Sequence, residues 1–427
     1  MTITKHTLTI THLNSSGEGV AFSEEGQTIL VPFTLASEKV TVALDADSQK
    51  SNVRRATLEK ILEPSPDRQK PLCPYFTQCG GCQLQHLNSV SYTKYKQGLV
   101  ADIFKANKLD ATVLDPIVFG PGLRRRINFK ITRNGSRVLV GFHRRRSHEV
   151  LDIDGCPLLL PNFNALLNPL KIALGSCMYE REEANIFLTK VDEGFDATLV
   201  FEDPKKLSLG QIESLTQWAH THQVVRLLLK TPKSEELLVH RTSPHVSFAG
   251  VPVLFPSHAF LQTSGVAEDR MTDLVLSLMP HGALKIADLF SGLGTFSFPL
   301  AQKGKVKAFE GDFKAVQYCN LSAQQNQLSH ALEATQRDLF KYPLSTVELN
   351  SYDVVVLDPP RAGAVSQIKQ LMESSVKTVI MVSCNANTFA RDAHLLVKGG
   401  YHMGDTHLID QFLWSPHVEL ISSFVRP

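Results

Sequence analysis

The chain has 427 residues, of which 43% are hydrophobic and 20% charged, which excludes a disordered chain and indicates a globular protein. At about 100–200 residues per domain, this length predicts two or three domains with sizeable cores. Lys and Arg number 44 against 42 Asp and Glu, so the net charge of +2 identifies no partner. Residues 121–148 differ, with nine Arg or Lys and no acid, as in a polyanion-binding face or a solvated basic hairpin.

The first residues lack the apolar core of a secretory signal. No stretch approaches about 18 consecutive apolar residues, so we expect no membrane span. The protein is therefore expected to be cytoplasmic, where thiols stay reduced. Seven cysteines in such a chain favour metal binding or catalysis over disulfides.

Residues 1–63 carry short runs of alternating apolar and polar residues between glycine turns. This pattern predicts a small β-barrel as the first domain. The expected strands are 6–12, 19–22, 28–32, 39–44 and 54–62. A proline-rich linker follows, and the pattern of residues 88–108 is helical.

A cysteine-rich segment lies between the linker and this helix. Its Cys-x5-Cys-Gly-Gly-Cys pattern brings Cys73, Cys79 and Cys82 together, and Cys156 could add a fourth thiol from a distance. Four thiolates suit either zinc or an iron–sulfur cluster. The spacing matches neither a zinc ribbon nor the Cys-x3-Cys-x2-Cys element of radical enzymes.

The middle third, residues 124–255, is expected to be mostly β, with helices near 162–174 and 208–220. From about residue 282 the pattern changes to alternating strands and helices, which predicts a doubly wound parallel sheet. The expected strands are 284–289, 305–309, 352–357, 377–382, 401–408 and 418–425. The expected helices are 295–302, 313–326, 365–374 and 388–397.

The ends of these strands carry acids and a glycine-rich turn. The turn at 288–296 contains Gly-x-Gly, but the third glycine of a dinucleotide fingerprint is absent, which argues against NAD. Glu310, twenty-two residues after Asp288, could bind a ribose diol, and Asp338 an adenine amine. With Asp358 these acids should share one sheet edge. A nucleoside ligand that needs no pyrophosphate site fits S-adenosylmethionine. Alternatively, each acid only caps the next helix.

Cys384 follows the strand expected at 377–382, at the same edge, and precedes a helix. The positive end of that helix dipole could lower the pKa of the thiol and make a thiolate available as a nucleophile. The alternative is a small buried apolar side chain.

Residues 383–392, 358–363 and 410–419, together with Phe260-Leu-Gln262, resemble motifs of the RNA uracil-5-methyltransferase family. The resemblance covers roughly residues 258–427. It implies that Cys384 is the nucleophile and Glu419 the base. It also implies that six residues line the cofactor and uracil site: Gln262, Phe290, Thr295, Glu310, Asp338 and Asp358. Ala386, Leu413 and Ser415 depart from the family pattern, which has Pro, Pro and Thr there.

The chemistry implied by this resemblance requires both residue types. The C5 carbon of uracil is a poor nucleophile until a thiolate adds to C6, and a base must then remove the C5 proton. The uracil must first leave its stack, and Phe260 could either hold the flipped base or pack in the core.

The resemblance extends to the rest of the chain. The cysteines, with Gln85-His86 and Cys156, are similar to the [4Fe–4S] element of the ribosomal RNA branch, and residues 1–63 are similar to a TRAM domain. The implied domains are a TRAM-like RNA-binding barrel (1–63), a β-rich central domain with the cluster (64–257) and a Rossmann-like S-adenosylmethionine-dependent methyltransferase domain (258–427).

The implied substrate is a uridine of 23S ribosomal RNA, and the implied protein a cytoplasmic monomer. The alternatives are a different rRNA site, the tRNA T-loop, or an RNA-binding protein with an idle methyltransferase fold. The residues expected to contact RNA are Arg54, Arg55, Lys60, Arg124–Arg126 and Arg144–Arg146, although a solvated face is an equal alternative for each residue of the barrel.

Overall fold

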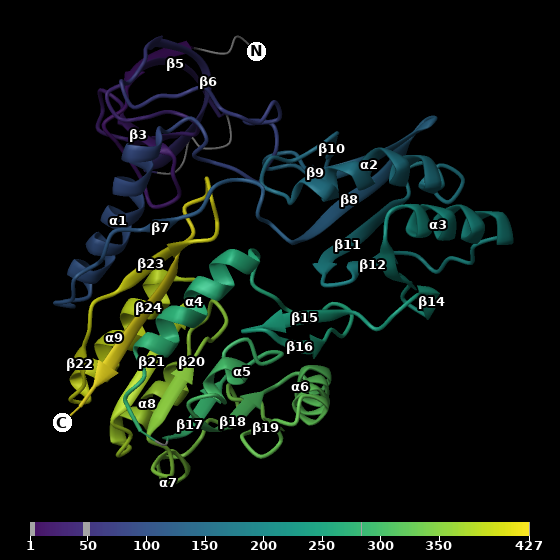
Figure 1. The fold of residues 1–427 in the computed structure, drawn as a ribbon. Coiled ribbons are helices and arrows are strands. Elements are labelled where there is room, and N and C mark those ends of the chain that lie inside the picture. Colours follow the sequence, from purple (N-terminus) through teal and green to yellow (C-terminus); the bar gives the residue numbers. More distant parts are fainter. Residues whose placement is uncertain (1–4, 46–51, 283, 427) are drawn as a thin grey trace. The chain divides into compact units, whose positions relative to one another are not determined.

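The computed structural model describes residues 5–45, 52–282 and 284–426 (Figure 1). By its internal contacts the chain divides into two compact units. The first comprises Met1–Leu99, Phe142–Leu151 and Phe412–His417, and the second comprises Val100–Gly141, Asp152–Gln411 and Val418–Pro427. The boundaries of the three domains expected from the sequence stay a prediction. Within the described ranges, no helix is long and apolar enough to cross a membrane.

The first unit contains a six-stranded sheet in the order β1-β5-β6-β4-β3-β2. Its strands are β1 (Lys5–Thr9), β2 (His12–Leu13), β3 (Gly19–Phe22), β4 (Thr28–Val31), β5 (Lys39–Leu44) and β6 (Val53–Glu63). Alternation along β5 buries Val40 and Val42 against Ile10 and Val31 in a small core. All five strands expected before residue 63 are present, and the prediction of short β-strands is confirmed.

Helix α1 (Ser89–Ala106) begins where the sequence indicated. Its buried Lys96 donates a hydrogen bond to the carbonyl oxygen of His417, and the Tyr92 hydroxyl accepts one from the backbone of Trp414 at 2.9 Å. The C-terminal segment Phe412–His417 is therefore fixed within the first unit, and it ends two residues before Glu419, the expected base.

A seven-stranded sheet has the order β10-β9-β8-β11-β12-β13-β14, and most of its residues belong to the second unit. Helices α2 (Pro161–Leu174) and α3 (Leu209–Thr221) pack against each other. The strands are β8 (Arg126–Asn134), β9 (Arg137–His143), β10 (Val150–Asp152), β11 (Glu183–Val191), β12 (Gly194–Phe201), β13 (Val224–Lys230) and β14 (Glu235–His240). A hairpin of β15 (His245–Phe248) and β16 (Val251–Leu254) follows. The β-rich middle third and its two helices agree with the sequence prediction.

The C-terminal sheet has the order β19-β18-β17-β20-β21-β24-β23-β7 (Figure 1). Its strands are β7 (Ile117–Val118), β17 (Leu284–Leu289), β18 (Gly304–Glu310), β19 (Leu332–Gln336), β20 (Val354–Leu357), β21 (Thr378–Ser383), β23 (His407–Asp410) and β24 (Glu419–Val425), and β22 (His402–Met403) pairs with β24. The neighbouring strands β19, β18, β17, β20 and β21 are parallel, as the buried run Val354–Leu357 predicts. In contrast, β24 is antiparallel to β21.

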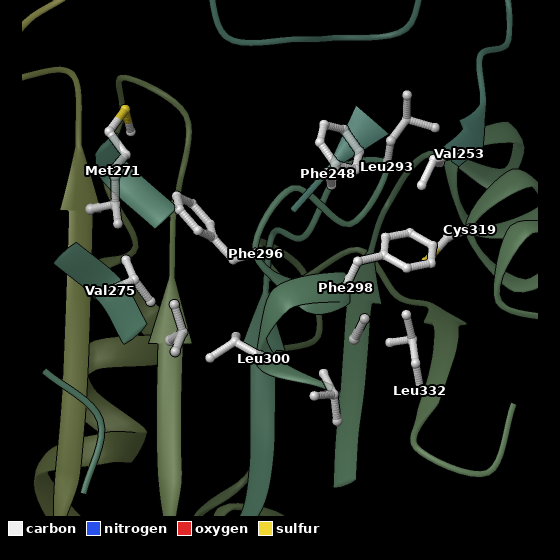
Figure 2. Packing of buried hydrophobic residues seen from close by; sticks show 14 of the residues in the cluster. Phe248, Val253, Met271, Val275, Leu293, Phe296, Phe298, Leu300, Cys319 and Leu332 are labelled. Carbon is white, nitrogen blue, oxygen red and sulfur yellow. The ribbon is translucent and has the colours of Figure 1, made fainter. Parts of the chain in front are cut away.

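The helices of this half are α4 (Gly265–Ser277), α5 (Ser297–Leu300), α6 (Phe313–Gln325), α7 (Thr346–Leu349), α8 (Val365–Glu373) and α9 (Ala386–Lys398). Figure 2 shows Phe296, Phe298 and Leu300 in the core with Met271 and Val275 of α4. A side chain at Gly294 would lie 2.9 Å from the Phe298 ring, and its φ of +96° also favours glycine. This packing explains the glycine.

Helix α5 is a correction to the sequence prediction, because it covers only Ser297–Leu300 instead of residues 295–302. Pro299 lies inside it and donates no backbone hydrogen bond, so the segment does not extend. Thr295 therefore precedes the helix.

Candidate active site

The strand register brings the predicted nucleophile and base to one sheet edge. β24 runs antiparallel to β21, with Leu420 opposite Ser383, so Glu419 begins one strand where Cys384 follows the other. Glu419 lies opposite Ile409 of β23, and Asp358 follows β20 on the other side of β21. The parallel strands and the final antiparallel strand thus place Cys384, Asp358 and Glu419 together.

The backbone around Cys384 is fixed by the next residue, Asn385. Its side-chain oxygen caps α9 by accepting hydrogen bonds from the backbone of Asn387 and Thr388, at 3.1 and 3.5 Å. Its amide nitrogen donates to the carbonyl oxygen of Arg361 at 3.1 Å. Ala386, where the family has Pro, is the first residue of α9, and the Asn385 cap anchors the loop without a proline.

The electrostatics of Cys384 contradict one sequence expectation. Burial, followed by the charges of Glu419 and Asp358, raises the pKa of the Cys384 thiol to about 11, although Arg361 acts in the opposite direction. The helix N-terminus does not outweigh these effects, so the predicted lowering of the pKa is wrong. The resting residue is a thiol that must lose its proton before it can attack.

Glu419 is a buried carboxyl group with one oxygen engaged. Its Oε1 accepts a hydrogen bond from Gln411 Nε2 at 2.9 Å. Its Oε2 is buried and has no hydrogen-bond partner within the part of the chain that the structure describes. Burial and then the neighbouring Asp358 raise the pKa of Glu419 well above its usual value, so its carboxylate is a strong base.

Gln262 and Gln411 connect this carboxyl group to Asp358. Gln411 Nε2 donates to Gln262 Oε1 at 2.8 Å, and Gln262 Nε2 donates to Asp358 Oδ2 at 3.2 Å. Burial raises the pKa of Asp358 to about 7. The structure therefore brings Gln262, Asp358, Cys384 and Glu419 together, as predicted, and adds Gln411 and Arg361. Nothing in the sequence indicated that Gln411 would contact a residue 149 positions away.

Glu310 and Asp338, the acids expected to bind the nucleoside, differ from each other in their hydrogen bonds. Glu310 accepts hydrogen bonds from the backbone of Gly292 and Asp312, both at 2.9 Å, so it lies beside the glycine turn. Asp338 lies beyond β19, which ends at Gln336, and its Oδ1 caps the turn to Phe340 and Lys341. Asp338 Oδ1 therefore has the capping role that was the alternative to ligand binding.

The glycine turn itself fits a polar ligand. Asp288 is buried, with a pKa raised to about 7 by burial, and its Oδ2 accepts a hydrogen bond from Ser297 at 2.5 Å. Asp288 Oδ1 and Ser291 Oγ are buried without a partner among the described residues, and no atom lies within 4 Å of a side chain added at Gly292. Phe290 packs on Phe340, with ring centroids 5.3 Å apart, and Thr295 is half-buried nearby in sequence.

The arginines at 124–126 have a structural role that the sequence did not indicate. Arg125 pairs with the buried Glu268 at 2.6 Å and donates to the carbonyl oxygen of Gln262 at 3.1 Å. Arg126 donates to the carbonyl oxygen of Leu261 and lies over the Phe260 ring, 5.1 Å from its centroid. Phe260 is 64% exposed, so the core-packing alternative for this aromatic is wrong.

In the first unit, three arginines converge on one buried carboxylate. Arg55, Arg145 and Arg146 approach Glu18 Oε1 at 3.3, 2.7 and 2.9 Å. Arg145 also lies over the Phe33 ring, 4.6 Å from its centroid. One negative charge among three guanidinium groups leaves an excess of positive charge on this surface, in agreement with a polyanion-binding role.

The first unit also holds three of the cysteines expected to bind a metal. The backbone of Cys79 forms an isolated antiparallel β-bridge with that of Arg144, and the Cys79 sulfur accepts a hydrogen bond from the backbone of Gly81 at 3.4 Å. Cys73 is close enough to raise the pKa of Cys79, although burial is the larger cause. Among the residues described, no three His, Cys, Asp or Glu side chains are gathered closely enough to hold a metal ion.

Comparisons with known proteins place the chain among RNA methyltransferases. Residues 253–423 match the family model described as tRNA (Uracil-5-)-methyltransferase. An uncharacterized RNA methyltransferase of Brucella melitensis is 38% identical, with 98% of this chain and 97% of the relative covered. The 23S rRNA (uracil(1939)-C(5))-methyltransferase RlmD of Pectobacterium atrosepticum is 30% identical, with 98% of this chain and 93% of the relative covered.

One solved structure is similar over nearly its whole length. It is the tRNA (uracil-54, C5)-methyltransferase of Pyrococcus abyssi, in complex with S-adenosyl-L-homocysteine. The TM-score is 0.77 at 23% identity, over 98% of this chain and 99% of that one. At this identity the likeness shows the fold.

Proposed function

We propose that this chain methylates a uridine of 23S ribosomal RNA. The chain belongs to the RNA uracil-5-methyltransferase family and is an S-adenosylmethionine-dependent enzyme of that family. The single observation that carries the reaction is the position of Glu419 beside Cys384, with Oε2 buried and unpartnered among the described residues. A substrate in this site would supply the missing contact.

The proposed reaction begins at Cys384. The thiol first loses its proton to water, and the thiolate sulfur then forms a bond to C6 of the uracil while the C5–C6 π electrons move toward C5 and O4. Arg361 interacts favourably with this thiolate, against the raising effect of burial, Glu419 and Asp358 on its pKa. S-adenosylmethionine supplies the methyl group to C5. Phe260, exposed beneath Arg126, is proposed to stack on the extruded base.

The reaction ends at Glu419. Its Oε2 accepts the C5 proton, the C5–H electron pair restores the C5–C6 double bond, and the C6–S bond breaks to release the Cys384 thiolate. The raised pKa of Glu419 makes its carboxylate a strong base for this proton. Gln262, Phe290, Thr295, Glu310, Asp338 and Asp358 are proposed to bind the cofactor and the uracil around it.

The RNA substrate is the finer part of the proposal. The identity to RlmD, 30% over nearly the full chain, supports 23S ribosomal RNA. A different rRNA site or the tRNA T-loop is the alternative, supported by the description of the family model. Mapping 5-methyluridine in RNA from cells without this protein tests it: loss of one site in 23S RNA is expected, and loss only from tRNA would contradict it. We also propose that the enzyme is a cytoplasmic monomer.

We further propose a [4Fe–4S] cluster bound by Cys73, Cys79, Cys82 and Cys156. The proposal is supported by the thiol set, and the Gly81 hydrogen bond to the Cys79 sulfur favours its thiolate against the larger raising effect of burial on the Cys79 pKa. The reaction above takes no electron, so the cluster's proposed role is structural.

Iron analysis tests this assignment. Anaerobically purified protein should be brown, with about four irons per chain, as four thiolate ligands require. Cys73→Ser should lower iron content and solubility together, because ligand binding contributes to folding. Cys177→Ala, at a buried cysteine outside the set, is the control. A colourless protein with one zinc would contradict the assignment.

The first unit, whose residues 1–63 are proposed to be a TRAM-like barrel, is proposed to bind RNA phosphates through the arginines around Glu18. The double variant Arg55→Gln/Arg146→Gln leaves Arg145 paired with Glu18. It should bind RNA more weakly and with a salt dependence about two units shallower, because fewer counterions are released. Lys39→Gln, which removes an exposed pair in the same sheet, is the matched control. An unchanged slope in folded protein would show that this surface binds another partner.

A further inference from the structure

The side-chain amide of Gln411 uses all of its hydrogen-bonding groups in contacts within the active site. Its Nε2 donates to Glu419 Oε1 at 2.9 Å and to Gln262 Oε1 at 2.8 Å. Its Oε1 accepts from the Thr263 backbone at 3.1 Å and from Thr263 Oγ1 at 3.0 Å. A glutamine amide has two donor hydrogens and an oxygen with two lone pairs, so these four contacts use all of them.

This network fixes the orientation of the amide. If the Gln411 amide were flipped, its oxygen would face two acceptor oxygens, and its nitrogen would face two donors of Thr263. Only the observed orientation satisfies all four contacts. The Thr263 backbone is itself held, because its carbonyl oxygen accepts a hydrogen bond from Arg125 at 2.8 Å. The donor that Gln411 presents to Glu419 is therefore preorganised.

We infer that Gln411 is a positioning residue for the base: it occupies Glu419 Oε1 and so leaves Oε2 as the oxygen that takes the C5 proton. The inference deepens the proposed function and rests on it. Through Gln262 the same amide also fixes Glu419 relative to Asp358, whose Oδ2 accepts from Gln262 at 3.2 Å. The positions of the two carboxyl groups thus depend on one side chain.

The hydrogen bond also affects when Glu419 is ionised. Donation by Gln411 stabilises the carboxylate and lowers the pKa of Glu419, against the larger raising effect of burial and the raising effect of Asp358. The groups whose charge acts on Glu419 are Asp358 and Arg361, and Cys384 lies close enough to respond to Glu419. Loss of the donor should therefore raise the pKa of Glu419. Because the base acts only when ionised, the acidic limb of the rate profile should then move to higher pH.

The test compares Gln411→Met with the wild type in single-turnover methylation of a 23S RNA fragment across pH. Turnover should fall about ten- to a hundred-fold, as a misplaced catalytic group predicts. The methylated enzyme–RNA adduct should accumulate, and the acidic limb should move to higher pH. Thr263→Val, which removes one of the two donors to Gln411 Oε1, should change the same quantities by less and serves if the first variant does not fold.

The matched control is Gln367→Met. Gln367 is a buried glutamine of the same sheet domain that bonds the backbone of Leu344 rather than a carboxyl group. It should alter stability without adduct accumulation or a displaced pH limb. If Gln411→Met folds and retains the wild-type limb and adduct level, the inference is wrong. If the wild-type enzyme itself makes no 5-methyluridine in any RNA tested, the proposed function fails instead.

Discussion

Cys384→Ala is expected to form neither 5-methyluridine nor a covalent RNA complex, with a loss in rate of about 10⁴-fold or more, as for removal of a nucleophile. Without the sulfur, C6 receives no addition and C5 stays too poor a nucleophile to accept the methyl group. The side chain is small and only half-buried at the end of β21, so alanine removes little packing. RNA binding should therefore be retained.

Methyl transfer from labelled S-adenosylmethionine and a denaturing gel measure this directly. Cys177→Ala serves as the control, because it removes a buried cysteine that the proposed chemistry does not use. Formation of 5-methyluridine by Cys384→Ala at a rate near that of the control would disprove nucleophilic catalysis by this residue.

Glu419→Gln should fail in a different way. Addition of Cys384 and methyl transfer remain possible, but no base takes the C5 proton, so elimination stalls and a methylated enzyme–RNA adduct accumulates. The loss in turnover should exceed the roughly 10²–10⁴-fold typical of a general base, because Glu419 is buried and water has poor access to the proton. Since Gln411 would donate to the new side-chain oxygen as it does to the old, the fold should be preserved.

The adduct is measured by gel mobility and by mass. Glu333→Gln, on the exposed face of β19, is a matched carboxyl-to-amide control and should turn over like the wild type. Normal turnover by Glu419→Gln, or loss of activity without any adduct, would contradict the assigned role.

Much of the fold could be predicted because its strands are strongly patterned. The run Val354–Leu357 is continuously apolar, as in a strand buried on both faces, and the structure buries all of it. Helix α4 was missed although Ser264 caps it and Ala267, Met271, Leu274 and Val275 are buried at helical spacing. β7, only two residues long, joins the C-terminal sheet through tertiary contacts that no local pattern encodes.

The site could be predicted only as residue types at strand ends. Motifs identified Cys384 and Glu419, but the pKa of Cys384 depends first on its burial and then on how close two carboxyl groups come in space, and the helix-dipole argument included neither. Gln411 lay within a quoted motif, yet its partners Gln262 and Thr263 are distant in sequence. Charges at 124–126 indicated RNA binding, whereas Arg125 is paired with a buried acid.

The most direct measurement of the central claim uses RNA in which the target uridine is replaced by 5-fluorouridine. Fluorine cannot leave C5 as a cation, so Glu419 has no proton to remove and the wild-type enzyme should be trapped after methyl transfer. Proteolysis and mass spectrometry should then locate one methylated nucleotide on the peptide that contains Cys384. An adduct on another residue, or no adduct from an enzyme that methylates the unmodified RNA, would contradict the account.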